Sequence, residues 1–351
     1  MNAKLKVMKQ KYVIGIDISK SKLDCAVMDF EYKIQYEMII SNTEKGIGDF
    51  LKKIVKLLKT SNEELLICCE NTGIYNRPLE RICTKSEVLL WIEHPVKIKK
   101  AASDLRGKDD KKDARRIADY AVRYRDKSIA YEEPCEVIQK MNILTKSRNT
   151  LVVQKTALEN QLREAKSHDR FEFTLLEESF SKALKVIKSS IKKIEDQLSV
   201  LIEKEQEIKQ NKDLLTSIPG IGEQCAINFI ISTNNFTSFD NAKHLACYAG
   251  VVPFKNQSGT IVKKERISKM ANQKLKKLLH MSAMASIRSD KEIKAYFHRK
   301  VEQGKNKMSV LNAVRNKLVH RIIAVIKRKL PFLPKEEFLS IKNSNNICSL
   351  T

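Results

Sequence analysis

The chain has 351 residues, of which 42% are hydrophobic and 31% are charged, a composition that can build two or three domains with buried cores. Lys and Arg number 66 against 42 Asp and Glu, a formal net charge of +24, and such an excess indicates a polyanionic partner such as nucleic acid. Residues 255–329 hold 21 Lys and Arg but four Asp and Glu, a net charge of +17. A generally basic proteome would spread the excess more evenly.

Cysteine usage and hydropathy exclude further classes of protein. The eight cysteines form no C-x-x-C motif and no Cys/His cluster with zinc-binding spacing, so we expect buried free thiols in a reducing cytoplasm. No apolar run is long enough for a membrane span, and the Lys-rich N-terminus lacks the apolar stretch of a secretory signal peptide. A disulfide scaffold, a zinc protein and a membrane protein are therefore not expected.

The first third of the chain predicts a mixed α/β sheet, because three successive strands are followed by alternating helices and strands. Short apolar or alternating runs predict strands at residues 12–18, 22–29, 33–40, 64–69 and 87–92. Apolar residues at helical spacing predict a helix at residues 44–59. Further helices are expected between and after the later strands, at residues 77–85 and 110–125, with a short one after His94-Pro95.

Two long helices are expected in the middle of the chain. The first covers residues 137–166, and the second begins after a break near residues 167–169. Its apolar residues follow alternating spacings of four and three, typical of a coiled-coil seam: Phe180, Leu184, Ile187, Ile191, Ile194, Leu198 and Leu201. We expect an arm over 135–210, in which the helices form an antiparallel hairpin or one pairs with a second protomer. Such an arm could build a homodimer or homotetramer.

Residues 211–330 are expected to form a largely helical basic domain, with amphipathic helices at 272–288 and 308–329. The sequence Ile-Pro-Gly-Ile-Gly at 218–222 resembles a helix-hairpin-helix, in which Gly220 and Gly222 would present backbone N–H groups to a phosphate. A plain turn between helices is the alternative. The Asn/Ser-rich segment 331–351 is expected to be a flexible tail.

A dense run of cations follows in the same domain. Phosphate contact is its expected role, with strong salt dependence, and a solvated helix face is the alternative for any one of its members. The expected nucleic-acid-binding residues are Lys263, Lys264, Arg266, Lys269, Lys274, Lys276 and Lys277.

Four acidic residues in the first third form a candidate metal site. Asp17 and Glu70 each end an apolar strand, so both can reach one edge of a sheet, and Asp110 and Asp113 are one helical turn apart and share a helix face. Such oxygen clusters bind Mg²⁺, and two Mg²⁺ ions can clamp the attacking and leaving oxygens of a phosphodiester. Taken singly, Asp110 and Asp113 also fit a solvated charged face.

Three segments resemble the DEDD-type bacterial insertion-sequence transposases, a family that includes the pilin-gene invertase. They are Gly-Ile-Asp-Ile-Ser-Lys at 15–20, Glu-Asn-Thr-Gly at 70–73 and Lys-Asp-Asp-Lys-Lys-Asp-Ala at 108–114. The resemblance implies an RNase H-like domain over 10–130, similar to a Holliday-junction resolvase, and hence an α/β plus α fold class for the chain. It implies that the catalytic residues and Mg²⁺ ligands are Asp17, Glu70, Asp110 and Asp113.

The third acidic position has an alternative. Family members commonly have Thr immediately before this acid, where the present chain has Asp109. Asp109 and Asp110 are therefore both candidates. The i, i+3 spacing to Asp113 and the following Ala114 favour Asp110.

The resemblance continues in the basic domain through Tyr-Ala-Gly-Val-Val-Pro at 248–253, Gln-Ser-Gly at 257–259 and Ile-Ser-Lys at 267–269, followed by Asn272. In that family the serine before the glycine is a nucleophile that joins covalently to DNA, which implies this role for Ser258. A serine hydroxyl needs activation by a base, a metal or a neighbouring charge, and without the resemblance Ser-Gly is a common loop dipeptide.

Two positions in this domain depart from the family pattern. Ala271 stands where the family has Gly before the Asn, and Lys276 stands where an Arg is usual. Both changes concern the supporting scaffold and phosphate contacts rather than the serine.

The resemblance implies a DNA transposase and site-specific recombinase of the bacterial cytoplasm and nucleoid, which cuts, exchanges and rejoins strands. Family members are guided by a structured non-coding RNA, so such a partner is implied here, and the acids and Ser258 could come from different protomers. A metal-dependent structure-specific endonuclease, similar to a junction resolvase, would need the acids but not Ser258. A non-catalytic nucleic-acid-binding scaffold would need neither. The size of the basic domain favours recombination.

Overall fold

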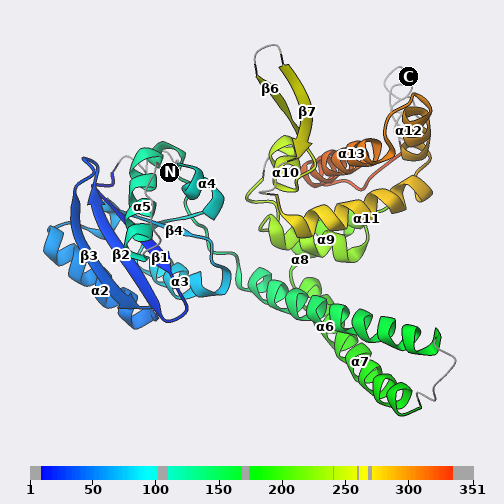
Figure 1. Cartoon of the computed structure of the whole chain (residues 1–351), viewed down its shortest axis with the longest axis horizontal. Coiled ribbons are helices and arrows are strands. Elements are labelled where there is room, and N and C mark those ends of the chain that lie inside the picture. Colours follow the sequence, from blue (N-terminus) through cyan, green and yellow to red (C-terminus); the bar gives the residue numbers. More distant parts are fainter. Residues whose placement is uncertain are drawn as a thin grey trace, which may run out of the picture. The chain divides into compact units, whose positions relative to one another are not determined.

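The computed structural model describes residues 9–101, 110–167, 174–239, 241–258, 261–267 and 271–334, without the side chains of 110–111, 167, 254–258 and 261–267. The chain divides into two compact units, Met1–Glu133 and Pro134–Thr351 (Figure 1). The boundary falls between the expected RNase H-like domain and the expected arm. The further division into an arm, a basic domain and a tail stays a prediction.

The first unit is built on a five-stranded mixed sheet in the order β3-β2-β1-β4-β5. The strands are β1 (Tyr12–Ile18), β2 (Lys22–Asp29), β3 (Ile34–Ser41), β4 (Leu65–Glu70) and β5 (Leu89–Glu93). β1, β2 and β3 pair antiparallel, whereas β4 runs parallel to both β1 and β5. The sheet confirms the expected RNase H-like α/β fold, and its strand bounds lie within two residues of the predicted ones.

Two layers of helices cover the sheet. The helices are α2 (Glu44–Leu58), α3 (Arg77–Lys85), α4 (Pro95–Ala101) and α5 (Asp110–Arg123), with short 3-10 turns at Asn62–Glu64, Gly73–Asn76 and Arg125–Lys127. α2 and α3 pack on one face, where Ile14 and Ile16 of β1 meet Phe50 of α2. α4 and α5 pack on the other, where Val13 meets Ala114. Successive residues of a strand therefore alternate between the two layers, and this alternation decides which acids can face α5.

The second unit begins with a hairpin of two long helices, α6 (Glu136–Ser167) and α7 (Thr174–Lys204). Ion pairs between them join Arg148 to Glu195 at 2.7 Å and Lys188 to Glu159 at 3.2 Å. From the first ion pair to the second, the residue number rises in α6 and falls in α7. The two helices of the chain therefore run antiparallel. The seam of α7 is buried at Leu184, Ile191, Leu198 and Ile202.

The rest of this unit is mostly helical, as expected. Its helices are α8 (Gln206–Thr216), α9 (Glu223–Ser232), α10 (Ala242–Tyr248), α11 (Gln273–Ser289), α12 (Lys291–Glu302) and α13 (Lys307–Arg328). One apolar core joins them to the adjoining ends of α6 and α7, through Met141 and Leu198. A two-stranded antiparallel hairpin, β6 (Pro253–Ser258) and β7 (Ile261–Ile267), was not expected from the sequence.

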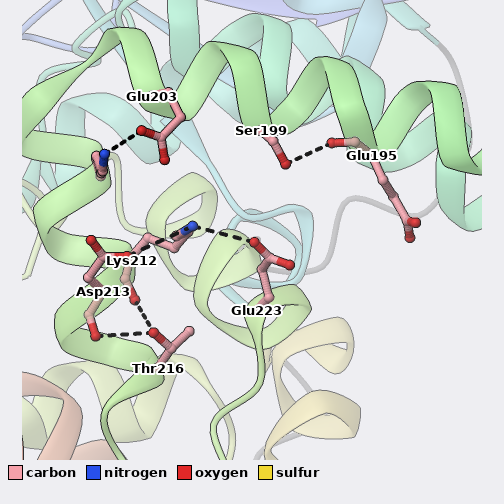
Figure 2. A network of polar contacts seen from close by, with 8 residues as sticks. Glu195, Ser199, Glu203, Lys212, Asp213, Thr216 and Glu223 are labelled. Atoms are coloured by element: carbon pink, nitrogen blue, oxygen red, sulfur yellow. Dashed lines mark hydrogen bonds and ion pairs between the residues drawn. The ribbon is translucent and has the colours of Figure 1, made fainter.

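Polar contacts hold α7, α8 and α9 together at their junctions. Figure 2 shows Lys212 of α8 bridging to Glu223 at the start of α9, with 3.4 Å between Nζ and Oε1. Glu203 near the end of α7 pairs with Lys209 of α8. These contacts fix the α8–α9 hairpin on the end of the arm. No helix within the described residues combines the length and hydrophobicity that crossing a bilayer requires.

Candidate functional site

The two strand-end acids lie on the same face of the sheet, next to each other. β1 and β4 are parallel, and Ile16 pairs with Cys69, so Asp17 and Glu70 are the next residues along adjacent strands. Ile16 and Cys69 face the α2–α3 layer. By strand alternation Asp17 and Glu70 therefore face α5.

Gly15 allows α5 to approach this face closely. A Cβ atom at Gly15 would lie 2.3 Å from both the carbonyl oxygen of Ala114 and the amide nitrogen of Ala118. Only a glycine leaves room for helix backbone to lie so near a strand. This contact is two residues before Asp17 and one residue after Asp113, so the same glycine brings the acids of β1 and α5 together.

Glu70 lies close enough to two of the other expected acids for their charges to affect its pKa. Burial raises the pKa of its carboxyl group, and the negative charges of Asp17 and Asp113 raise it further. Arg116 and Lys99 oppose this shift without reversing it. Arg116 also pairs with Asp113, at 2.7 Å between Nη1 and Oδ1. A carboxyl group held between two like charges is a site that a cation would stabilise.

We expect Glu70→Gln to raise the unfolding temperature of the protein at pH 7 in EDTA. The pKa of Glu70 is higher folded than unfolded, so its ionisation costs native stability once the pH rises through the folded pKa, and Gln removes that cost. The gain should shrink as the pH falls toward 4. Thermal unfolding measured across this pH range, with the exposed Asp49→Asn variant as control, checks the sign; a lower unfolding temperature for Glu70→Gln at pH 7 would contradict it.

The fourth acid is placed only by its backbone. α5 begins at Asp110, four residues before the buried Ala114, so Asp110 occupies a helix position in register with the sheet-facing stripe. Asp109 lies outside the described residues, and the choice between the two stays a prediction. Among the side chains that the structure describes, no three His, Cys, Asp or Glu form a ready-made metal-binding group.

Two further acids on this face were missed from the sequence. Asp24 of β2 pairs in register with Asp17, and Glu93 of β5 pairs with Glu70. Both are buried. The available signal was a carboxylate inside an apolar strand, but only the strand register places it beside the predicted site.

Ser258 lies at the end of β6, where it pairs with Ile261 of β7. Its side chain is outside the described part, as are residues 259–260 between the strands. At the other end of the hairpin, Pro253 pairs with Ile267. The predicted nucleophile therefore occupies the far end of a β-hairpin that extends from the helices around α10 and α11 (Figure 1).

The other residues of the serine motif meet at the base of this hairpin. The side-chain amide of Asn272 donates to the hydroxyl oxygen of Tyr248 at 3.0 Å, and the Asn272 backbone N–H donates to the Tyr248 carbonyl at 2.8 Å. Asn272 also caps α11 by accepting from the Leu275 N–H. Gly250 has a φ of 66° and a Cβ there would lie 2.2 Å from the Cβ of Ala271. These contacts join the two ends of the motif.

The predicted phosphate-binding cations fall on β7 and α11. Lys263, Lys264 and Arg266 belong to β7 by backbone, and Lys269 is outside the described residues. Lys274, Lys276 and Lys277 lie in the first turn and a half of α11, a helix start that favours anions. Desolvation lowers the pKa of Lys274, and the charge of Lys146 on α6 lowers it further. Two cations held near each other are consistent with an anionic ligand.

The segment predicted to be a helix-hairpin-helix forms the turn between α8 and α9, and its two glycines have different surroundings. Gly220 has a φ of 92°, and a Cβ there would lie 2.1 Å from Ser286 Oγ of α11. Ser286 also donates to the Pro219 carbonyl at 2.7 Å. Packing therefore explains Gly220 without a nucleic acid. Gly222 has open space around it, and its contact with phosphate stays a prediction.

Comparisons with known proteins find similar sequences over most of the chain. A sequence profile described as "Transposase IS116/IS110/IS902 family" matches residues 212–298, and a transposase profile of the IS110 DEDD type matches residues 14–165. The pilin gene-inverting proteins of Moraxella bovis and Moraxella lacunata are each 27% identical over 331 residues, which cover 92% of this chain and 98% of the relative. An insertion element IS110 uncharacterized 43.6 kDa protein of Streptomyces coelicolor is 28% identical over 149 residues, 42% of this chain and 36% of that protein.

Among solved structures, this chain is similar to T. thermophilus RuvC in complex with a Holliday junction substrate. The sequence identity is 12% and the TM-score 0.27, and the match covers 33% of this chain and 94% of that chain. A second Thermus thermophilus RuvC structure matches with 11% identity and a TM-score of 0.26, covering 34% of this chain and 98% of that one.

Proposed function

We propose that the chain is a transposase of the IS116/IS110/IS902 family, whose profiles match residues 14–165 and 212–298, and that it moves its insertion sequence by site-specific recombination, in which an acidic site and Ser258 cut and rejoin DNA. The observation that carries the acidic part is the parallel register of β1 and β4, which places Asp17 and Glu70 side by side on the face that α5 covers. The family's DEDD profile covers all of these residues.

The donor set of the acidic site fits a hard divalent cation. Its members supply oxygen only, which suits Mg²⁺ or Mn²⁺, and a cation would be attracted by the negative charges of Asp17 and Asp113 near Glu70. We propose that the ligands are Asp17, Glu70, Asp110 and Asp113, and that they hold two ions. When bound, the metal would neutralise charge on a phosphodiester and orient it. The protein's part is to hold the carboxylates at one edge of the sheet, through Gly15 and the β1–β4 register.

Ser258 supplies the nucleophile in this proposal. Its Oγ attacks the scissile phosphorus and loses its proton to a base, the P–O bond to the leaving DNA oxygen breaks, and a serine–DNA phosphodiester forms. A DNA hydroxyl then attacks that phosphodiester, restores the serine and rejoins the strand. The number of phosphodiester bonds is unchanged, so no external energy source is needed. The end of a protruding hairpin is a position from which a residue can reach a DNA backbone.

The basic segment and a guide RNA complete the proposal. Lys274 and Lys276 on α11, with the cations of β7, contact phosphates, and a structured non-coding RNA from the element pairs with the DNA. The arm formed by α6 and α7 joins two or four copies of the chain. Exposed apolar side chains on the arm, Ile143 and Val200, support this assembly, in which the acids and Ser258 could act in trans.

Ser258→Ala is expected to abolish the covalent protein–DNA adduct, a loss of at least about 10³-fold. The adduct is measured on denaturing gels with the full chain, Mg²⁺, a labelled DNA fragment spanning one end of the element and RNA transcribed from the flanking non-coding segment. Ser289→Ala is the matched control, because Ser289 is an exposed serine near the end of α11.

The same experiment separates the main alternative. An undiminished adduct in Ser258→Ala would remove that serine from the mechanism. Cut DNA with free ends and no adduct in the wild type would instead indicate hydrolysis by water, as in a structure-specific endonuclease. An adduct that forms equally well without the RNA would remove the guide RNA from the proposal.

A further inference from the structure

Four adjacent strands each place one acid in a single row across the α5 face of the sheet. Asp24 of β2 pairs with Asp17 of β1, and Glu70 of β4 pairs with Glu93 of β5. Asp17 and Glu70 are themselves neighbours, because the residues before them, Ile16 and Cys69, pair across β1 and β4. The strand residues next to these acids belong to the apolar core under α2 and α3. Because successive strand residues face opposite sides of the sheet, all four acids face the α5 side. Two members of the row are unassigned so far: Asp24 and Glu93.

Glu93 is fully partnered by protein groups. It accepts from the backbone N–H of His94 at 2.7 Å and from the hydroxyl of Tyr120 at 3.2 Å, and it pairs with Lys97 at 3.0 Å. The residue is buried, with 7% of its surface exposed. Hydrogen bonding of this kind satisfies a buried carboxylate, so Glu93 has a structural role.

Asp24 differs because one of its two carboxylate oxygens has no hydrogen-bond partner among the described residues. The residue is 3% exposed, and Lys22 pairs with Oδ2 at 3.1 Å. Oδ1 is buried and has no hydrogen-bond donor in the part of the chain that the structure describes. A buried acceptor without a donor is unfavourable, so this oxygen calls for a donor other than the residues that the structure describes.

The position of Asp24 indicates what that donor is. Residues directly opposite in an antiparallel pair have Cβ atoms about 4.5–5.5 Å apart, so Asp24 and Asp17 present like charges side by side. A hollow of about 130 Å³ adjoins Asp24 and is also lined by Glu37 and Ala114. This volume accommodates water molecules. A water molecule bound to a cation can donate a hydrogen bond to Asp24, and the cation offsets the negative charges of Asp24 and Asp17.

We propose that Asp24 is a positioning residue of the acidic site, whose Oδ1 accepts hydrogen bonds from water molecules bound to a divalent cation at Asp17. Mg²⁺ keeps several of its waters in proteins, and carboxylates that hold such ligands in place strengthen metal binding. Lys22 fixes the other oxygen, which keeps the carboxylate from rotating away. The inference rests on the proposed metal-binding function and adds a residue to it.

A titration of the metal-free full chain with Mn²⁺, followed by the electron paramagnetic resonance signal of free Mn²⁺, tests the proposal without DNA. Asp24→Asn should weaken Mn²⁺ binding by about 10-fold, the lower end of the effect of losing such a carboxylate. Asp17→Asn should weaken it more. Glu93→Gln is the matched control, a buried acid of the same row with three protein partners, and it should leave the affinity within about twofold of wild type.

Thermal unfolding in EDTA separates positioning from a structural role. Asp24→Asn is nearly isosteric, keeps an oxygen that can face Lys22 and removes the repulsion with Asp17, so its metal-free form should unfold near the wild-type temperature. A lower unfolding temperature with unchanged Mn²⁺ affinity would overturn the proposal. If Asp17→Asn lost Mn²⁺ binding while Asp24→Asn kept it, this inference alone would fail. Equal binding by Asp17→Asn and wild type would remove the proposed metal site and Asp24 with it.

Discussion

Asp17→Asn is expected to slow DNA strand cleavage by at least about 10²–10³-fold, the effect of removing one group that stabilises transition-state charge, while the protein stays folded. Asp17 and Glu70 lie at the ends of neighbouring parallel strands and face α5. Asn keeps the size of the side chain but removes one of the charges that a cation needs. It also removes a charge that raises the pKa of Glu70.

The control for this variant is Asp119→Asn on α5, where the lost carboxylate pairs with Arg123 at 3.0 Å. Cleavage rates are measured on labelled DNA with Mg²⁺, and DNA affinity is measured in parallel. The affinity of Asp17→Asn should stay near that of wild type, because contacts of Lys and Arg with phosphates supply most of it. Cleavage by Asp17→Asn at the rate of the control would mean that the acidic site is not catalytic.

Periodicity predicted the first unit closely, for a physical reason. Its strands are buried, so each apolar run in the sequence ends close to the end of its strand, at Ile18 for β1 and at Glu70 for β4. α2 begins at Glu44, because the Thr43 hydroxyl accepts from the Gly46 N–H and caps the helix. The strand-end acids were therefore visible in the sequence, and the parallel register of β1 and β4 confirms that Asp17 and Glu70 are neighbours.

The hairpin β6–β7 and the role of Asp24 were not visible in the same way. β6 has the sequence Pro-Phe-Lys-Asn-Gln-Ser, which lacks alternation, so only pairing with β7 identifies it as a strand. Asp24 has an apolar neighbour on each side, Leu23 and Cys25. The sequence indicates a buried strand there, but which acid lies across from Asp24 depends on the register of the β1–β2 hairpin. Both features come from contacts between strands rather than from local pattern.

Gly15→Ala is expected to lower the free energy of unfolding by about 1–3 kcal/mol, the usual cost of overpacking a core. The added methyl group would meet the Ala114 carbonyl oxygen and the Ala118 nitrogen, both at 2.3 Å. These are backbone atoms in the middle of a helix, so the clash cannot be relieved by turning a side chain. α5 must move away from β1 and carry Asp113 with it. Cleavage should fall by about 10²-fold in the molecules that still fold, since a misplacement of 1 Å has that effect.

Gly48→Ala is the matched control, because a Cβ at Gly48 in α2 would meet no atom outside the local helix backbone within 4 Å. A glycine in a helix costs about 0.5–1 kcal/mol relative to alanine, so this variant should be more stable than wild type and equally active. Chemical denaturation and cleavage rates of both variants separate the two effects of Gly15. If Gly15→Ala lost stability but kept full cleavage activity, the approach of α5 to β1 would be a packing feature alone. Loss of both would show that one missing methyl group sets the distance between the acids of the sheet and the acids of the helix.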